Sequence, residues 1–352
     1  MPIRLGKAKP FHQPMTMQIL GELKPGETKR HLVKLPGAAL AKDEPRPVIS
    51  LTGAKPGPLL FVNAGVHGGE YPAIEAVIRL SKALDPKKIV GTVILMPVMN
   101  LPAFRSRTPF VCPIDHVNPN RVFPGDPSGS YSEQMTHALI NEFVVHADEY
   151  IDLHGGDIPE ALVPFVICRS ETGLADGKAR DVAARSKQMA LAFGLPYVLT
   201  VSKPVQPSKG LSSYAAAAEK GIPSILAEAG GVGQLQEDQV ELLVDGVKRV
   251  MQHLGMLPEV RRSSASARLR RDQQTAATVL TKFEWLYTRH AGMWYPRAAA
   301  GDKVKEGEEI GTVGDLFGDT LERIVSPVNG VVLFLTINPS VLENGLLMGI
   351  GL

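Results

Sequence analysis

The sequence predicts an α/β protein with a mostly parallel sheet covered by helices on both faces, followed by a small β-domain. Two observations support this fold class. Between about residues 50 and 255, continuous apolar runs alternate with segments of helical periodicity. After residue 275, short strand-like segments separated by Gly, Pro and Asn turns continue to the end. Strands that alternate with helices imply parallel pairing with helical crossovers.

The individual elements follow from the two periodicities. Apolar runs typical of strands buried on both faces lie at 58–65 and 91–98. A strand and loop are expected at 149–156, and further strands at 163–168, 197–201 and 223–230. Helical periodicity predicts helices at 71–84, 135–146, 175–193 and 235–255. In the N-terminal segment, two short strands are expected at 15–23 and 29–36, joined by the turn-like sequence KPGET.

The chain is expected to divide into three parts. Residues 1–257 form the α/β domain, which includes an N-terminal β segment at 1–50. Residues 258–275 are rich in Ser and Arg and poor in apolar side chains, which predicts a solvated linker; phosphate binding by its arginines is the alternative. Residues 276–352 form the small β-domain.

Composition excludes several classes of protein. The net charge is only +2 and 21% of residues are charged, so neither a nucleic-acid nor a membrane partner is expected. Two cysteines cannot form a disulfide framework, and the N-terminus lacks the apolar run of a signal peptide. These features predict a cytoplasmic protein. The chain has neither a G-x-S-x-G nucleophile elbow nor a G-x-x-x-x-G-K-[ST] phosphate loop.

Four polar side chains follow predicted strands. His67 and Glu70 come after the strand at 58–65, His154 lies at the end of the strand that begins at 149, and Glu228 ends the strand that begins at 223. In open α/β sheets, ligands bind outside the carboxyl ends of the strands. We therefore expect these four groups to meet at one edge of the sheet.

The residue types suit a metal. Two histidines and one carboxylate form a common catalytic zinc site that leaves one position open, although cobalt or manganese can replace zinc at such ligands. His67 and Glu70 are three residues apart and can face the same ion, with His154 as the third ligand. Asp152 would point to the same side of its strand as His154 and is a candidate to support that imidazole.

The fourth group, Glu228, is the candidate general base, which would take a proton from water and pass it to the leaving amine. A buried carboxylate is costly without a role, although a purely structural pair with an arginine is the alternative. Similarly, a His-x-x-Glu sequence taken alone is also compatible with an ordinary surface pair. The four positions together favour the metal site.

Four segments carry a family resemblance: NAGVHGGEYPAIEAV, NPNRVFPG, YIDLHGG and LAEAGG. In this order they resemble the succinylglutamate desuccinylase/aspartoacylase family, a branch of the zinc carboxypeptidase-like hydrolases, over roughly residues 50–255. The resemblance implies a zinc-carboxypeptidase-like mixed sheet flanked by helices. It also implies one zinc ion per chain, held by His67, Glu70 and His154, with Glu228 as the catalytic glutamate.

The resemblance further implies substrate-binding residues. Asn120 and Arg121 match the Asn-Arg pair that holds the substrate carboxylate, a role that suits the two parallel donors of a guanidinium; a surface salt bridge is the alternative for this arginine. The family also uses an upstream arginine to polarise the scissile carbonyl. Arg107 is favoured for that catalytic role and Arg105 is a second, substrate-binding candidate, although Pro109 and Phe110 stand where a further arginine is expected.

Two other segments bear on the pocket. His116 lies near the Asn-Arg loop and is a candidate to line the pocket. The C-terminal domain resembles a biotinyl/lipoyl carrier barrel, but the centre of the carrier motif, VGDLFGDTLERI, lacks the lysine that would be modified. A swinging-arm role is therefore not expected. We expect this domain to wall the cleft and narrow access to it.

These observations predict a zinc-dependent deacylase that hydrolyses the amide bond of a small N-acyl amino acid or related carboxylate-bearing compound. Two alternatives remain: a metallocarboxypeptidase acting on short peptides, and a relative that binds zinc without catalysis. Apart from a small-molecule acyl-amino-acid substrate, the expected partner is a second copy of the chain in a homo-oligomer.

Overall fold

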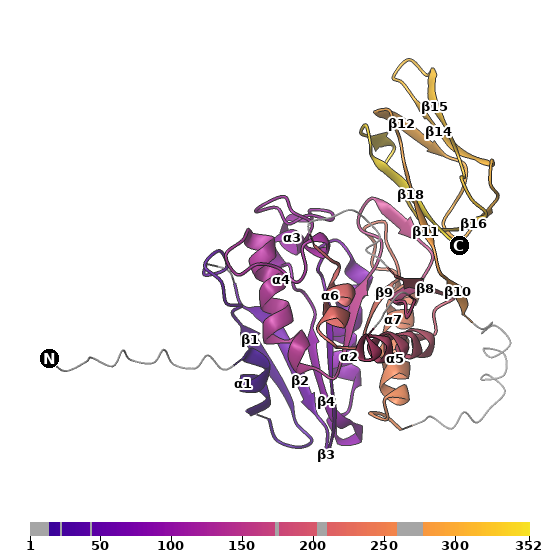
Figure 1. Cartoon of the computed structure of the whole chain (residues 1–352). Coiled ribbons are helices and arrows are strands. Elements are labelled where there is room, and N and C mark those ends of the chain that lie inside the picture. Colours follow the sequence, from indigo (N-terminus) through magenta and orange to yellow (C-terminus); the bar gives the residue numbers. More distant parts are fainter. Residues whose placement is uncertain (1–13, 22, 43, 173–175, 203–209, 259–276) are drawn as a thin grey trace.

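The computed structural model describes residues 14–21, 23–42, 44–172, 176–202, 210–258 and 277–352. A layered α/β body holds most of the chain, and the yellow C-terminal strands stand on one end of it (Figure 1). The Arg-rich stretch and all but the first residue of the predicted linker 258–275 lie outside the described residues.

A nine-stranded mixed sheet runs through the α/β body in the order β1-β2-β4-β3-β5-β9-β7-β8-β10. Its strands are β1 (Thr28–Val33), β2 (Arg46–Thr52), β3 (Lys55–Ala64), β4 (Val90–Met96), β5 (Glu149–His154), β7 (Phe165–Arg169), β8 (Tyr197–Val201), β9 (Ser224–Glu228) and β10 (Thr278–Leu280). The central strands β4, β3, β5 and β9 are mutually parallel, whereas β1–β2, β2–β4 and β7–β9 pair antiparallel.

Helices cover both faces of this sheet, as predicted. Alternate residues of the central strands contribute to two cores, one beneath α2, α5 and α7 and the other beneath α4 and α6. The helices are α1 (Met15–Gly21), α2 (Tyr71–Ala83), α3 (Leu101–Ser106), α4 (Tyr131–Glu142), α5 (Gly177–Phe193), α6 (Ser213–Glu219) and α7 (Glu237–His253), with short 3-10 turns η1 (Pro86–Lys88), η2 (Pro119–Arg121) and η3 (Val144–His146). No helix among the described segments is both long enough and apolar enough to cross a membrane.

Two sequence predictions for helices need correction. The strand expected at 15–23 is wrong, because Met15–Gly21 forms α1. Its first turn is tied to the end of α4: the Met15 N–H donates to a carboxylate oxygen of Glu142 at 2.8 Å, and the Thr16 hydroxyl donates to the carbonyl of Glu142 at 2.6 Å. These contacts span more than 120 residues, so local propensity could not predict them. The helix expected at 135–146 begins earlier, at Tyr131, after a capping box formed by Ser130 and Glu133.

The predicted small β-domain is confirmed, and its strands form two antiparallel sheets. They are β11 (Phe283–Tyr287), β12 (Gly292–Pro296), β13 (Lys303–Val304), β14 (Glu309–Gly314), β15 (Thr320–Val325), β16 (Gly330–Thr336), β17 (Ser340–Val341) and β18 (Leu346–Gly351). The α/β body and the C-terminal domain each add one strand to a sheet of the other. From the α/β body, β6 (Glu160–Leu162) pairs with β16, and from the C-terminal part, β10 pairs with β8 of the large sheet. The exact domain boundaries at 257 and 276 stay a prediction.

The register of the parallel strands positions the candidate site. Ala64 of β3 lies opposite Leu153 of β5, and His154 lies opposite Glu228 of β9. The carboxyl ends of three neighbouring strands are therefore level with each other at one edge of the sheet. Polar side chains that follow these strands must meet there.

Candidate active site

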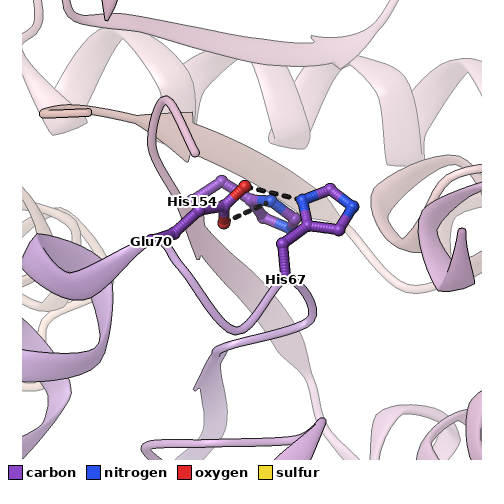
Figure 2. Close-up of side chains that lie close together, drawn as sticks. All are labelled: His67, Glu70 and His154. Carbon is purple, nitrogen blue, oxygen red and sulfur yellow. Dashed lines mark hydrogen bonds and ion pairs between the residues drawn. The ribbon is translucent and has the colours of Figure 1, made fainter. Parts of the chain in front are cut away.

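Three side chains converge on one point beyond the strand ends. Figure 2 shows the carboxylate of Glu70 between the imidazoles of His67 and His154. One oxygen, Oε1, lies 2.6 Å from Nδ1 of His67, and the other, Oε2, lies 2.9 Å from Nδ1 of His154. All three residues are buried, and one potential ligand atom from each lies within 4.8 Å of the other two.

The local backbone explains this convergence. Glu70 is the N-cap residue of α2, so it sits where the loop after β3 turns into the helix. The glycines between the two candidate ligands are needed for close packing: a Cβ on Gly68 would lie 2.1 Å from the backbone of α3, and one on Gly69 would lie 2.0 Å from Asp157.

Each histidine has a second partner behind it. Nε2 of His67 lies 3.1 Å from the side-chain oxygen of Asn118, and Nε2 of His154 lies 2.9 Å from Oδ2 of Asp152. The Asp152 carboxylate in turn accepts a hydrogen bond from the hydroxyl of Ser213. These contacts leave Nδ1 of both rings directed at the Glu70 carboxylate, the orientation in which a histidine ligand is held by an outer acceptor.

Charge in this cluster suits a cation. Burial raises the pKa of Glu70, but the neighbouring His154 and His67 outweigh it and lower the pKa to about 2. Burial lowers the pKa of His154, but Asp152 and Glu70 outweigh it and raise the pKa well above its usual range. The carboxylates therefore stabilise positive charge at this point, which a metal ion would supply in place of a proton. Oε2 of Glu70 is buried and makes no well-aligned hydrogen bond among the described residues, so it remains available as a ligand. The donor set fits a zinc ion.

Glu228 ends β9 beside this cluster and faces the same cavity. Burial raises its pKa, the positive charge of His154 opposes this shift and nearby Glu70 and Asp152 add to it, and the net pKa is about 8. Such a carboxyl holds a proton more readily than an ordinary glutamate. It can therefore accept and release one near neutral pH.

The Asn-Arg pair also lines the cavity. Asn120 is buried, and its side-chain oxygen accepts a hydrogen bond from the Ser213 N–H at 3.0 Å. Arg121 donates through Nη1 to the carbonyl of Asn120 at 2.8 Å. Burial lowers the pKa of Arg121, while Tyr214 and nearby acidic groups oppose the shift. The structure thus brings two of the three predicted substrate-binding residues, Asn120 and Arg121, to the cavity that His67 and Glu70 also line.

The structure does not place Arg107 or Arg105 against the cavity. Arg105 is exposed and forms an ion pair with Glu44 on the surface. Arg107 is exposed at the end of α3, in left-handed conformation with φ of 57°. Neither lines the cavity as described, so the predicted carbonyl-polarising and substrate-binding roles are not supported for them. The reason is the short α3, which ends in a left-handed residue and directs this segment outward. His116 is likewise exposed and does not line the cavity.

Several lining residues were missed by the sequence predictions. Phe110 stands edge-on to His67 with ring centroids 6.0 Å apart, at the position where the sequence departs from the family pattern. Glu160 faces the cavity, and burial together with the charge of Glu228 raises its pKa well above the usual range. Its place six residues after His154, at the start of β6 and shortly beyond a strand end, was a usable signal. Tyr214 has no comparable sequence signal.

The sequence is similar to that of known hydrolases. The family model of the succinylglutamate desuccinylase/aspartoacylase catalytic domain matches residues 56–254, more than half of the chain. The chain belongs to this family. The N-alpha-acetyl-L-2,4-diaminobutyric acid deacetylase of Halomonas elongata is 28% identical over 263 residues, which cover 74% of this chain and 71% of that protein.

Solved structures share the fold over almost the full length. A succinylglutamate desuccinylase/aspartoacylase from Rhodobacter sphaeroides matches with a TM-score of 0.76 and 24% identity, covering 93% of this chain and 96% of that one. The product-bound ectoine utilization protein EutE (DoeB) of Ruegeria pomeroyi matches with a TM-score of 0.78 and 22% identity, covering 94% and 97%. Both comparisons confirm the predicted fold class, including the C-terminal β-domain.

Proposed function

We propose that the protein is a zinc-dependent deacylase that hydrolyses the amide bond of a small, carboxylate-bearing N-acyl amino acid. The observation that carries the proposal is one cavity, of about 340 Å³, that contains all three required elements. These are a candidate metal site, a half-buried glutamate beside it and an Asn-Arg pair. The deacetylase relative from Halomonas elongata, whose name specifies an N-acetylated amino acid, supports the same reaction class.

Each group has a defined task in this proposal. His67, Glu70 and His154 hold one zinc ion, and Asn118 and Asp152 orient the two imidazoles. When bound, zinc supplies Lewis-acid polarisation of the scissile carbonyl and favours deprotonation of water.

The remaining residues act on the substrate and on protons. The carboxylate of Glu228 takes a proton from the attacking water and passes it to the nitrogen of the leaving amine. Arg121, with Asn120, binds the substrate carboxylate through charge-assisted hydrogen bonds and so positions the amide at the metal end of the cavity.

A panel of substrates tests this function. Zinc-loaded protein is expected to release free amine from N-acyl amino acids and to be inactive on di- and tripeptides with free N-termini. The two classes are compared by kcat/KM with a ninhydrin or coupled amine assay. Turnover of the peptides without turnover of the acyl-amino acids would instead establish a metallocarboxypeptidase. A protein that binds zinc and acts on neither class would be a non-catalytic relative.

A further inference from the structure

Beyond Glu228 the active-site cavity becomes an apolar chamber. We use this name for the part lined by Phe165, Leu199, Phe283, Trp285, Phe334 and Leu346. Two of these residues belong to β7 and β8 of the large sheet, and four to the C-terminal sheet. The chamber therefore lies where the C-terminal strands β11, β16 and β18 stand over the edge of the α/β body (Figure 1).

The chamber begins directly at the reaction site. Phe165 lies opposite Glu228 in the antiparallel β7–β9 pair. On the other side, β6 brings Leu162 opposite Phe334 of β16, so the C-terminal sheet is joined to the loop that follows His154. A substrate whose amide lies at the metal end thus has its next atoms at the mouth of the chamber.

The three aromatic side chains that the C-terminal sheet contributes to the chamber pack against one another. The ring centroids of Phe283 and Trp285 are 4.9 Å apart, those of Trp285 and Phe334 are 5.2 Å apart, and the two phenylalanine rings are stacked at 5.7 Å. Gly349 of β18 makes room for both phenylalanines, since a Cβ there would lie 2.2 Å from one ring and 2.4 Å from the other. A wall held by such contacts does not need to collapse or reorder when a ligand enters.

Burial within the chamber is incomplete. Trp285 and Leu346 remain partly exposed, whereas Phe165 and Leu199 beneath them are buried. An apolar group entering the chamber would remove this remaining apolar surface from water, which is favourable. A charged group would lose its hydration there, and among these six side chains only the indole N–H of Trp285, which has no hydrogen-bond partner among the described residues, could donate to it.

The size of the cavity also suits a ligand with a bulky group. Its volume of about 340 Å³ lies within the range of roughly 300–1,000 Å³ that is typical of pockets for drug-sized ligands. The six chamber residues line one part of this cavity, so apolar surface is available there to a group larger than acetyl.

We propose that the chamber binds a bulky apolar group of the substrate. On this proposal the preferred substrates are N-acyl amino acids with a carboxylate for Arg121 and a large aliphatic or aromatic group on one side of the amide. This inference rests on the proposed deacylase function. It separates the specificity of this chain from that named for the diaminobutyrate deacetylase, whose amine product is small and polar.

Two substrate series test the inference with zinc-loaded, full-length protein. The first varies the amino acid of N-acetyl compounds from alanine and 2,4-diaminobutyrate to leucine and phenylalanine. The second varies the acyl group on alanine from acetyl to butyryl, hexanoyl and benzoyl. One series is expected to rise in kcat/KM by roughly tenfold or more per well-placed addition, and the rising series identifies the side of the amide that enters the chamber.

Binding provides a readout that does not depend on turnover. Calorimetric titration of the metal-free wild-type chain with the same compounds is expected to show Kd falling as the apolar group grows. If N-acetyl-diaminobutyrate is hydrolysed or bound best and both series fall with size, the inference is overturned while the deacylase function stands. Absence of turnover with Kd still falling would overturn the deacylase function but retain the chamber as an apolar binding site.

Variants locate the effect. Leu346→Trp narrows the chamber and is expected to lower kcat/KM at least tenfold for the largest good substrate, with less than a threefold change for the acetyl-alanine compound. Phe317→Ala is the matched control, because Phe317 is 95% exposed in the same domain and away from the cavity. If Leu346→Trp does not fold, judged by thermal unfolding, Trp285→Ala is expected to lower the preference for the bulky group instead. An unchanged preference in a folded chamber variant would contradict the proposal.

Discussion

The two ends of the cavity are built in different ways. The metal end consists of charged and polar side chains, each placed by the end of a central parallel strand or by the loop directly after it. The apolar chamber consists of residues from β7 and β8 of the large sheet and from a second sheet, brought together across more than 100 residues of sequence. The residues proposed for the chemistry thus lie in local sequence motifs, whereas the residues proposed for specificity depend on how the C-terminal sheet packs on the α/β body. The predictions below test this division.

The largest effect is expected at the candidate metal ligands. His154→Ala removes one of three ligands and leaves Glu70 with one imidazole fewer, so bound zinc and activity should both fall to background. Metal content by mass spectrometry and kcat on the best acyl-amino acid measure the two effects. His290→Ala, at an exposed histidine of the C-terminal domain, should change neither. Zinc-stoichiometric, fully active His154→Ala protein would remove this residue from the site.

The second effect separates proton transfer from metal binding. Glu228→Gln keeps the shape of the side chain but cannot accept a proton, so kcat should fall roughly 10²- to 10⁴-fold. Zinc content should remain at one ion per chain, because Glu228 is not a ligand in this account. A variant that retains both zinc and full activity would show that another group is the base.

A smaller effect is expected at the substrate carboxylate. Arg121→Lys keeps the charge but loses the paired donors, which should cost roughly 10- to 100-fold in kcat/KM, mainly through KM. Arg105→Lys is the matched control, because Arg105 pairs with Glu44 on the surface and should be silent. If Arg105→Lys were as damaging as Arg121→Lys, the surface position of Arg105 would not describe the working enzyme.

The polar end could be predicted from sequence because its residues lie at, or directly after, the ends of three neighbouring parallel strands. His67, Glu70, His154 and Glu228 were expected to meet for this reason, and they do. The exposed positions of Arg107 and Arg105 were not expected, because they depend on where the short α3 ends, which spacing does not reveal, and the roles of these two residues stay a prediction. For the apolar chamber, the sequence predicted only that the C-terminal domain would wall the cleft. The residues that form the chamber could not be predicted, because Phe334 and Phe165 come together through packing of one sheet on another. Likewise, α1 depends on a distant contact with Glu142.

The outer partners of the metal end should have a milder influence. Asp152→Asn weakens the acceptor behind His154 without removing a ligand, so zinc affinity should fall roughly 10- to 100-fold. Competition with a chromogenic chelator measures this affinity. An affinity equal to that of the wild type would mean that the hydrogen bond does not orient the ring.

The stability of the metal-free protein should depend on pH because the pKa of Glu228 is raised in the folded state. The folded pKa of Glu228, about 8, lies above its ordinary value of 4.5, so the folded state retains this proton while the unfolded state has lost it. The metal-free wild type should therefore lose stability as pH rises from about 4.5 to 8, at up to roughly 1.4 kcal/mol per pH unit from this group. Glu228→Gln should be the more stable protein at pH 9 and about equal to wild type near pH 4.5. Urea unfolding at both values would show this crossover, and a pH-independent difference would contradict the assignment.

Metal reconstitution tests the central claim most directly. The protein is stripped with chelator, assayed on its best acyl-amino acid, and titrated with zinc while metal content and rate are measured together. The account predicts no turnover without metal and a rate that rises linearly to a plateau at one zinc per chain. Full turnover by metal-free protein, or a chain that binds no zinc at its His67, Glu70 and His154 cluster, would contradict it.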